Sequence, residues 1–504
     1  MTTPSEKLAS SLEVLKTLQD AGLSSVRSSD LTRTHRERLI KHGFLQEVMK
    51  GWYIPSRPNE KAGESTAWYA SYWSFCTSYL TSRFGDSWCL SPEQSILLHT
   101  GNTHIPKQLL VRTPKARNRI TDLPHGTSLF DVKSTVPEAN LIVIKDNMRL
   151  FSLPAALVAC SSSYYQQRPT ELRTALAMIK HSSDVLGLLL DGGHSIIAGR
   201  LAGGFRNIGR NQVADEIISA MQAADFNVRE VDPFNEKLPP LGELRETSPL
   251  AIRIRLMWQN MRTDIIGRFP EPVPLNDIDA YLAKVDDIYA TDAYHSLSIE
   301  GYQVSPELIE QVRSGNWNPD KIEADQQHRN AMAARGYWQA FQEVRNAVKE
   351  CLEGKNAGTI ADQDHGVWYR EMFAPSVAVG LLKPSDLAGY RNAPVFIRRS
   401  MHVPPSTEDV RDTMPVLFEL LRDEPEASVR IVLGHFIFVY IHPYIDGNGR
   451  TGRFLMNLMM ASGGYPWTVI PVERRDDYMQ ALEAASVEGN IIPFTDFIVS
   501  VMES

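Results

Sequence analysis

The spacing of apolar side chains predicts two helices at the start of the chain. Leucines at positions 8, 12, 15 and 18 recur at helical intervals and the pattern stops at Ala21-Gly22, so we expect a first helix over residues 6–22. Ser28, Ser29 and Asp30 offer capping side chains for a second helix over residues 31–42, which ends at Gly43. The exposed side of this second helix carries basic residues, among them Arg33, Arg36 and Lys41.

Two short β-rich runs follow the helices. Residues 44–48 and 52–54 flank a turn at Gly51, and Pro55 closes the second run, which is typical of a hairpin. Helices followed by a hairpin indicate a winged helix over residues 1–58. The basic helix makes Arg33, Arg36 and Lys41 candidates for DNA contact, although such residues also serve simply to solvate a helix and winged helices also dock proteins.

The pattern changes twice more along the 504 residues. Residues 59–235 mix strand-like runs at 109–112 and 141–144 with helical stretches such as 214–224, which predicts an α+β domain. Proline-rich segments at 232–241 and 269–275 mark a helical connector over 236–284. Helical periodicity then dominates residues 285–504, and helices are expected at 278–290, 324–351, 407–421, 426–441, 451–461 and 476–488. The predicted fold class is multidomain and mainly α.

Composition narrows the class of protein. A hydrophobic fraction of 43% and a charged fraction of 22% are those of a soluble globular protein, and a net charge of -8 gives no overall attraction to nucleic acid. The polar opening segment does not look like a secretion signal, and the apolar run 431–441 is too short to cross a bilayer. The four cysteines are widely separated and suggest no zinc site. We therefore expect a cytoplasmic protein that makes no membrane contact.

One segment of the helical region concentrates several chemical groups. In His442-Pro-Tyr-Ile-Asp446-Gly-Asn-Gly-Arg450, glycines flank Asn448 directly before a helical run, so backbone N–H groups and a helix N-terminus can form an anion site. Arg450 and Arg453, three residues apart, add two permanent positive charges near one helix face. Asp446 beside phosphate implies a bridging Mg²⁺, and His442 has the chemistry of a general base. The pattern predicts a phosphate-binding loop next to a base.

The segment resembles the signature of the Fic family, His-Pro-Phe-x-(Asp/Glu)-Gly-Asn-Gly-Arg-x-x-Arg, with Tyr444 in place of the phenylalanine. The resemblance extends over roughly residues 285–500 and implies an α-helical Fic domain over 285–504. It implies that His442 deprotonates a Ser, Thr or Tyr hydroxyl of a target protein, which attacks the α-phosphate of ATP, and that Asp446 holds Mg²⁺. The site residues it implies for ATP are Gly447, Asn448, Gly449, Arg450 and Arg453. It also makes 426–441 a helix, although its β-branched and aromatic residues alone favour a strand.

Two further segments are similar to parts of that family. Gly389–Arg398 resembles the flap, a small β-hairpin that aligns an extended target segment, and it places Val395, Phe396, Ile397 and Arg398 beside the nucleotide. Tyr478 matches the family's tyrosine on the adenosine side. A neighbouring tyrosine of many relatives is replaced by Met479, which leaves the nucleotide preference open.

A short motif ahead of the Fic region resembles the family's inhibitory helix. Ser296-Leu-Ser-Ile-Glu300-Gly301 fits (Ser/Thr)-x-x-x-Glu-(Gly/Asn) and predicts an inhibitory helix at about 290–302. Ser296 and Glu300 share one helix face, so the hydroxyl is expected to steady the carboxylate. The resemblance implies that Glu300 pairs with Arg453 and keeps that side chain from the γ-phosphate.

The first 235 residues resemble AbiEi-type antitoxins and related regulators, most specifically from Leu39 to Tyr53. This resemblance implies DNA binding through a winged helix. Three functions therefore stand beside one another: a self-inhibited protein adenylyltransferase, which we favour, a transcriptional regulator whose Fic domain senses nucleotide, and an enzyme that removes AMP from modified proteins. A homodimer is left open, as are the target protein and the DNA sequence.

Overall fold

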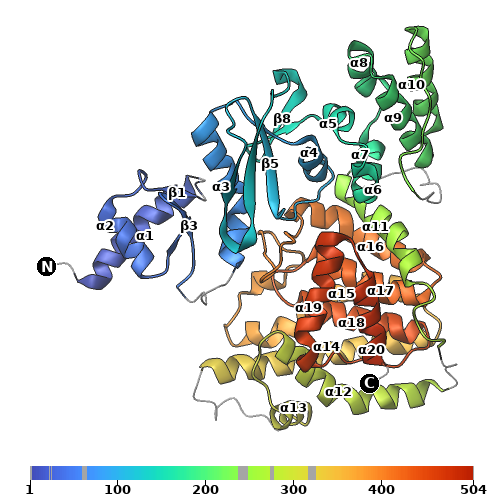
Figure 1. Cartoon of the computed structure of the whole chain (residues 1–504). Coiled ribbons are helices and arrows are strands. Elements are labelled where there is room, and N and C mark those ends of the chain that lie inside the picture. The colour runs from blue at the N-terminus through green and yellow to red at the C-terminus, as the bar shows by residue number, and fades with distance from the viewer. Residues whose placement is uncertain are drawn as a thin grey trace. The chain divides into compact units, whose positions relative to one another are not determined.

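The computed structural model describes residues 3–21, 23, 25–58, 65–235, 248–272, 277–315 and 325–502. The chain divides into two compact units (Figure 1). Unit 1 comprises residues 1–245 and 396–403, and unit 2 comprises residues 246–395 and 404–504. The predicted domain boundaries after residues 58, 235 and 284 stay predictions, and the first two fall beside residues 59–64 and 236–247, outside the described residues.

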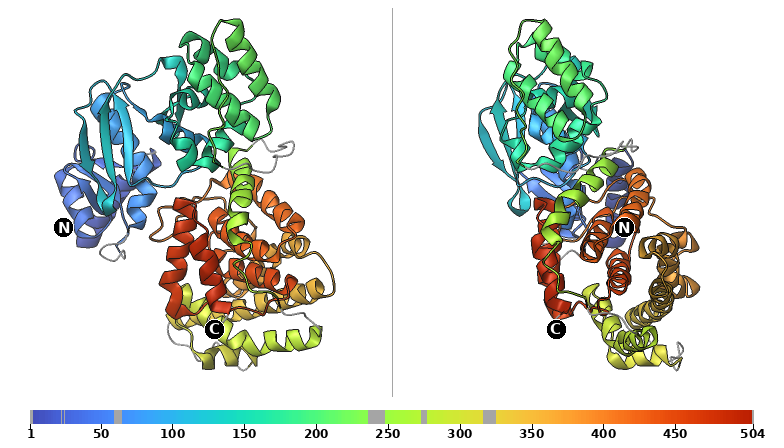
Figure 2. Two further views of the ribbon diagram at one scale, coloured as in Figure 1. Left: turned by 45° about the vertical axis from the view of Figure 1, so that its right-hand side comes forward. Right: turned by 90° about the vertical axis from the view of Figure 1, so that its right-hand side faces the viewer.

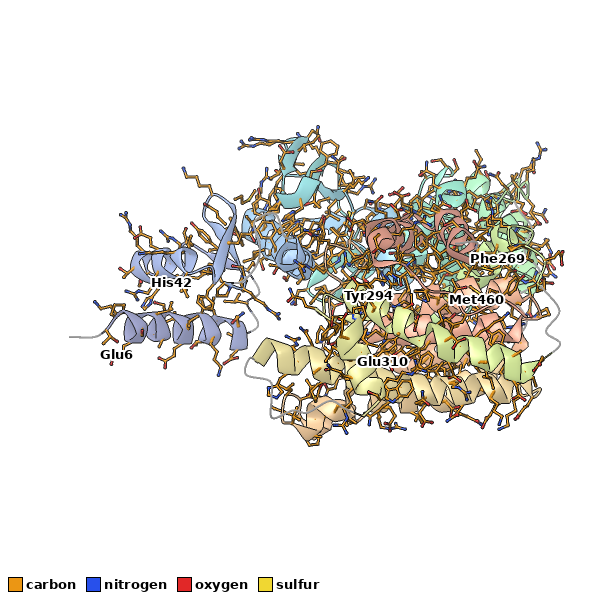
Figure 3. The ribbon with its side chains drawn as sticks, turned by 90° about the horizontal axis from the view of Figure 1, so that it is seen from below. Glu6, His42, Phe269, Tyr294, Glu310 and Met460 are labelled. Carbon is orange, nitrogen blue, oxygen red and sulfur yellow. The ribbon has the colours of Figure 1, made fainter. Side chains whose placement is uncertain are left out.

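Unit 1 begins with two helices and a small sheet. α1 (Pro4–Asp20) and α2 (Arg33–Lys41) lie side by side in Figure 3, where Glu6 marks α1 and His42 follows α2. β1 (Val26–Arg27), β2 (Leu45–Met49) and β3 (Trp52–Pro55) form an antiparallel sheet in the order β1-β3-β2. Leu15, Leu39 and Leu45 share its core. Both predicted helices and the predicted hairpin are confirmed.

The rest of unit 1 joins a mixed sheet to a group of helices. β4 (Cys89–Leu90), β5 (Gln108–Thr113), β6 (Arg119–Asp122) and β7 (Ser128–Lys133) form a sheet in the order β4-β5-β7-β6, in which β5 and β7 run parallel. α3 (Thr66–Phe84) covers it, with Trp68 and Phe75 packed against Leu109 and Leu129. β8 (Ile142–Lys145) pairs with β9 (Met148–Phe151). The remaining described helices are α4 (Pro92–His99), α5 (Leu153–Ala159), α6 (Tyr164–Gln167), α7 (Pro169–Met178), α8 (Ser183–Asp191), α9 (Ser195–Asn207) and α10 (Asn211–Ala223).

Unit 2 contains helices joined by loops, and its described residues include no strand. α14 (Asp325–Leu352) and α15 (Ala357–Ala378) lie side by side (Figure 2), and α17 (Ala427–Ile441) packs on α18 (Asn448–Ser462). Every predicted helix of this region is present. The other helices are α11 (Pro249–Ile265), α12 (Ile278–Ile299), α13 (Pro306–Arg313), α16 (Thr407–Asp423), α19 (Arg475–Glu483), a π-helical turn (Ala484–Glu488) and α20 (Ile492–Met502).

The predicted β-hairpin flap is wrong. Residues 389–403 contain no strand, and their described backbone is a sequence of bends and extended stretches. Within the predicted hairpin, Pro394 has no N–H to give to a ladder. The carbonyls of Ala393 and Pro405 accept instead from the guanidinium of Arg391.

The second part of this segment is built into unit 1. Ile105 N donates to Met401 O at 2.9 Å, and Thr103 Oγ1 donates to Val403 O at 3.1 Å. Met401 and Val403 also pack against the apolar core beneath the mixed sheet. Residues 396–403 belong to unit 1, so this unit includes Phe396, Ile397 and Arg398, whereas Val395 belongs to unit 2.

None of the described helices combines the length and the hydropathy needed to span a membrane.

Candidate active site

The loop between α17 and α18 is shaped by two residues with left-handed backbone. His442 ends α17 with φ 54° and ψ 60°, and Gly447 precedes α18 with φ 81°. A Cβ at Gly447 would lie 2.7 Å from the Phe373 ring, so both the backbone angle and the space require glycine there. His442 has a side chain and still adopts the left-handed region, which costs conformational energy that its surroundings have to offset.

Asn448 closes the loop with its side chain. Its Oδ1 accepts from Tyr444 N at 2.9 Å, and its Nδ2 donates to Tyr444 O at 2.8 Å. Tyr444 is buried and stacks on Tyr369 with 3.9 Å between ring centroids. Tyr444 thus fills the anchoring position that the sequence comparison gave to phenylalanine. The amide of Asn448 is committed to the loop, so any contact with an anion falls to the backbone N–H groups at the start of α18.

The geometry leaves His442 as a neutral base. Its Nδ1 lies 3.1 Å from Val439 O, and because a carbonyl only accepts, Nδ1 carries the proton and Nε2 keeps a lone pair. Burial lowers the pKa of His442 to about 4. The imidazole is therefore uncharged near neutral pH and able to accept a proton at Nε2.

Arg450 and Arg453 bring two buried positive charges to the first turns of α18. Arg450 lies between the rings of Tyr302 and Phe373, 5.2 and 5.1 Å from their centroids. Burial would lower the pKa of each guanidinium, but the surrounding carboxylates and tyrosines, chiefly Asp446 for Arg450 and Glu300 for Arg453, together outweigh it and raise both pKa values. Arg450 Nε and Arg453 Nη1 are buried donors with no hydrogen-bond acceptor among the described residues. Buried donors of this kind are suited to an anionic ligand.

Glu300 sits directly on this arginine. It caps the C-terminus of α12, and its Oε1 accepts from Arg453 Nη2 at 2.8 Å, with side-chain exposures of 25% and 4% for the two partners. A Cβ on Gly449 would fall 2.4 Å from Glu300 Oε1, so the carboxylate lies against the first turn of α18. The N-terminal end of that helix favours a negative charge. Glu300 therefore occupies the place that the turn offers to an anion.

Ser296 contacts Arg453 and not Glu300, the partner expected from the sequence. Its Oγ accepts from Arg453 Nε at 2.9 Å, and its backbone carbonyl accepts from Arg453 Nη2 at 3.0 Å. No hydrogen bond joins Ser296 to Glu300 in the described part of the chain, so the prediction that the hydroxyl steadies the carboxylate is wrong. Both residues instead hold the same guanidinium from α12, because helical spacing turns positions 296 and 300 toward one partner.

Asp446 has the chemistry of a magnesium ligand. Its side chain is 56% exposed, one oxygen lies 3.3 Å from Arg450 Nη2, and the same oxygen accepts from Gly447 N at 2.6 Å. The described residues hold no cluster of three or more metal-ligating side chains. A single carboxylate at a phosphate-binding loop fits Mg²⁺, which takes its remaining ligands from water and substrate phosphates.

Tyr478 lies in the core next to the loop. It is buried, its hydroxyl is 2.7 Å from His435 Nε2, and burial raises the pKa of Tyr478 to about 12. The structure thus brings Tyr478 close to Arg453 with its ring packed against Phe494 and Phe497. Its contact with an adenosine stays a prediction.

The three predicted DNA-contacting residues all lie on α2. Arg33 pairs with Glu37 at 2.7 Å, and Arg36 Nη1 donates to Ser28 O at 3.0 Å while lying over the Tyr53 ring. Lys41 is exposed at the end of the helix. α2 therefore carries an exposed basic surface in which two of the three side chains already have local partners.

Sequence reasoning missed four residues that shape the site: Tyr302, Tyr369, Phe373 and Arg391. Tyr369 and Phe373 lie at helical spacing on α15, a pattern shared by ordinary core positions. Arg391 was visible only as part of the supposed flap, although its guanidinium donates to His442 O at 2.8 Å. No local pattern could have indicated that contact, because it joins residues 51 positions apart.

Comparisons with known proteins point to this same region. Residues 368–460 match the model of the Fic/DOC family. Over 129 residues the chain is 39% identical to a protein adenylyltransferase Fic from Nematostella vectensis, covering 25% of this chain and 30% of the relative. The corresponding protein of Drosophila willistoni is 37% identical over 129 residues, which cover 25% of each protein. The match thus spans less than a third of these curated relatives.

Solved structures give a weaker likeness. A Fic-1 fragment from C. elegans has a TM-score of 0.38 at 20% identity, covering 66% of this chain and 89% of that chain. A Fic-domain signaling protein from Bacteroides thetaiotaomicron has a TM-score of 0.35 at 15% identity, covering 49% and 92%. The loop from His442 to Arg453 falls inside residues 368–460, the segment that matches the Fic/DOC family model.

Proposed function

We propose that this protein is a protein adenylyltransferase that moves AMP from ATP to a hydroxyl side chain of a target protein and is inhibited in cis by Glu300. One observation carries the proposal: a neutral histidine and two buried arginines with unused donors meet at the N-terminus of one helix. The relatives named as protein adenylyltransferases support the same reaction.

The residues divide the chemistry among them. His442 Nε2 takes the proton of the target hydroxyl while its oxygen forms a bond to the α-phosphorus of ATP. The bond from that phosphorus to the bridging oxygen breaks, and pyrophosphate leaves with the electron pair. Arg450 and Arg453 neutralise the charge that accumulates on the leaving phosphates, and the N–H groups of Asn448, Gly449 and Arg450 face the transferred phosphate.

Asp446 is the residue that would hold a magnesium ion. Its exposed carboxylate stands at the edge of the phosphate-binding loop. When bound there, Mg²⁺ neutralises phosphate charge and orients the leaving group. Tyr478 is proposed to lie on the adenosine side, and Val395, Phe396, Ile397 and Arg398 are proposed to align the target beside the nucleotide.

Inhibition follows from competition for one guanidinium. As long as Glu300 and Ser296 hold Arg453, that side chain cannot turn to the γ-phosphate, and the Glu300 carboxylate repels an anion at the first turn of α18. ATP then binds without the contacts that favour transfer. Removal of the carboxylate is expected to release Arg453.

Mass spectrometry with ATP tests the proposal. The Glu300→Gly variant, incubated with ATP, Mg²⁺ and a cell extract of candidate targets, should add one AMP per modified hydroxyl, and adding His442→Ala should abolish the addition. The proposal fails if Glu300→Gly adds no AMP to itself or to any protein, although it binds ATP.

Removal of AMP is a second function that one observation favours. Glu300 is partly exposed beside the loop, where a carboxylate can orient a water molecule. Release of AMP from a modified target by the wild-type protein, lost in Glu300→Gly, identifies that activity, whereas added AMP identifies transfer.

The N-terminal region is proposed to bind DNA through the basic surface of α2, formed by Arg33, Arg36 and Lys41. The resemblance of residues 39–53 to antitoxin-type regulators supports the proposal, and the polar opening segment supports a cytoplasmic location. An electrophoretic shift on the promoter of its own gene, lost on raising the salt concentration, is the expected result.

Sedimentation across a range of concentrations would show whether the protein forms a homodimer.

A further inference from the structure

Arg391 is a fully buried arginine whose hydrogen-bond acceptors are all backbone carbonyls. It is 1% exposed. Its Nε donates to His442 O at 2.8 Å, its Nη1 donates to Ala393 O at 3.3 Å, and its Nη2 donates to Pro405 O. Its own backbone N donates to Pro443 O at 2.9 Å. One residue thus reaches the histidine, the residue after it, and both ends of the segment 393–405.

This arrangement is costly for the folded protein. A buried charge normally has a carboxylate partner, and Arg391 has none within hydrogen-bonding distance in the described part of the chain. Burial lowers the pKa of Arg391 to about 10, opposed only by the more distant Asp409. An apolar residue would fill the same space without this penalty. Stability therefore does not explain why an arginine, with several N–H donors, stands at this position.

Arg391 contacts the part of the loop whose backbone conformation is energetically unfavourable. His442 is one of the few residues other than glycine with positive φ, and its carbonyl has no helical partner because α17 ends there. The Nε–H of Arg391 satisfies that carbonyl, and the Arg391 N–H satisfies the next one. Two bonds to successive carbonyls fix the peptide planes on either side of Pro443 and, through them, the direction of the imidazole.

We propose that Arg391 is a positioning residue that holds His442 in its left-handed conformation and ties the base to the two ends of the segment 393–405. The inference rests on the proposed function, since it concerns the base of that reaction. A change at either end of the segment then reaches the imidazole through a single guanidinium. All four residues that make these contacts, Arg391, Ala393, Pro405 and His442, belong to unit 2.

Enzyme kinetics in the Glu300→Gly background test the role of Arg391. Arg391→Ala should lower kcat for AMP transfer by about 10²-fold, because a displacement of about 1 Å has that effect on a reacting group. The Kd for ATP should change less than about threefold, since Arg450, Arg453 and the first turn of α18 remain. The kcat of Arg391→Lys, which keeps the charge but reaches fewer carbonyls, should lie between those of Arg391 and Arg391→Ala. Guanidinium ion in the buffer should restore part of the kcat lost in Arg391→Ala.

The matched control is Arg411→Ala. Arg411 is exposed on α16, and its one partner among the described residues is Thr407 O of its own helix, so its loss should leave kcat unchanged. Equal kcat values for the variants at 391 and 411 overturn the proposal. So does a loss of ATP affinity in parallel with kcat that guanidinium does not restore, because that pattern indicates a merely structural role.

A crystal structure separates this inference from the proposed function. If Glu300→Gly transfers no AMP, the proposed function fails. The φ angle of His442 in a crystal structure of Arg391→Lys still tests the inference about Arg391. A change of φ at His442 to negative values, or loss of density for the loop, supports the positioning role. An unchanged φ of about 54° in the variant contradicts it. Arg391→Lys also serves where Arg391→Ala does not fold.

Discussion

Two arginine–glutamate pairs, one in each unit, have nearly the same length and very different surroundings. Arg33 Nε lies 2.7 Å from Glu37 Oε1 on α2, with side chains 82% and 58% exposed. Arg453 Nη2 lies 2.8 Å from Glu300 Oε1, with side chains 4% and 25% exposed. Water and salt screen the first pair, whereas in the second the arginine is buried and the glutamate only partly exposed. Distance alone therefore says little about either pair, and burial distinguishes a surface contact from a candidate switch.

The largest effect is expected at the base. In the Glu300→Gly background, His442→Ala should lower the rate of AMP transfer by about 10²- to 10⁴-fold, because it removes the group that takes the proton in the proposed reaction. The initial rate of labelled AMP incorporation measures it. Thermal unfolding of the variant is the control, since a reduced rate in an unfolded protein carries no information about the base.

The buried and exposed pairs can be compared directly by stability. Arg453→Met should lower the free energy of unfolding by roughly 2–4 kcal/mol, because it leaves the Glu300 carboxylate without its partner. Arg33→Met, the matched change in the exposed pair, should leave the urea midpoint unchanged within error. Equal midpoints for the two variants would contradict the contrast between the pairs.

Asp292 on α12 extends the comparison of buried and exposed carboxylates to the pH dependence of stability. Asp292 is buried and accepts from Tyr337 at 2.6 Å, and burial raises the pKa of Asp292 to about 6. The folded protein then holds this proton more tightly than the unfolded chain, so the contribution of Asp292 to stability falls as pH rises from about 4 to 6. Asp292→Asn removes that fall. The difference in unfolding free energy between variant and wild type should grow by about 2 kcal/mol in favour of the variant over this range. A difference that stays constant with pH would rule out the shift.

The smallest effect on transfer is expected from α2. Replacing Arg33, Arg36 and Lys41 together by alanine should abolish a salt-sensitive DNA shift and leave the AMP transfer rate of Glu300→Gly unchanged. If the triple variant still shifts DNA with the same salt dependence, the basic surface of α2 is not the DNA-binding site.

Sequence predicted the elements better than their contacts. α17 illustrates the reason: its apolar and β-branched residues are buried on every side, so the helix has no amphipathic pattern and local propensity favours a strand. Only the resemblance of the following loop indicated a helix. The flap shows the opposite error, because a familiar motif suggested a hairpin over residues 389–398, where the described backbone forms no strand and Pro394 has no N–H for a ladder.

At the candidate site, residues with local signals could be found and residues with distant partners could not. The glycines and arginines from Gly447 to Arg453 follow one another at the start of a helix, and the pair of Ser296 and Glu300 follows helical spacing. Arg391 acts on a carbonyl far along the chain, and Arg450 is enclosed by Tyr302 from the loop after α12 and by Phe373 from α15. Such contacts arise from tertiary packing, which no local pattern encodes.

The central claim is that Glu300 restrains transfer by holding Arg453. The most direct measurement is the initial rate of labelled AMP incorporation from ATP for wild type, Glu300→Gly and Glu300→Gln, with Glu310→Gln as the control. Glu310 makes an exposed pair with Arg313 at 3.7 Å, so its change should have no effect. We predict a rate about tenfold or more above wild type for both variants at position 300, equivalent to at least 1.4 kcal/mol of barrier. Rates equal to wild type at a saturating ATP concentration would contradict the claim.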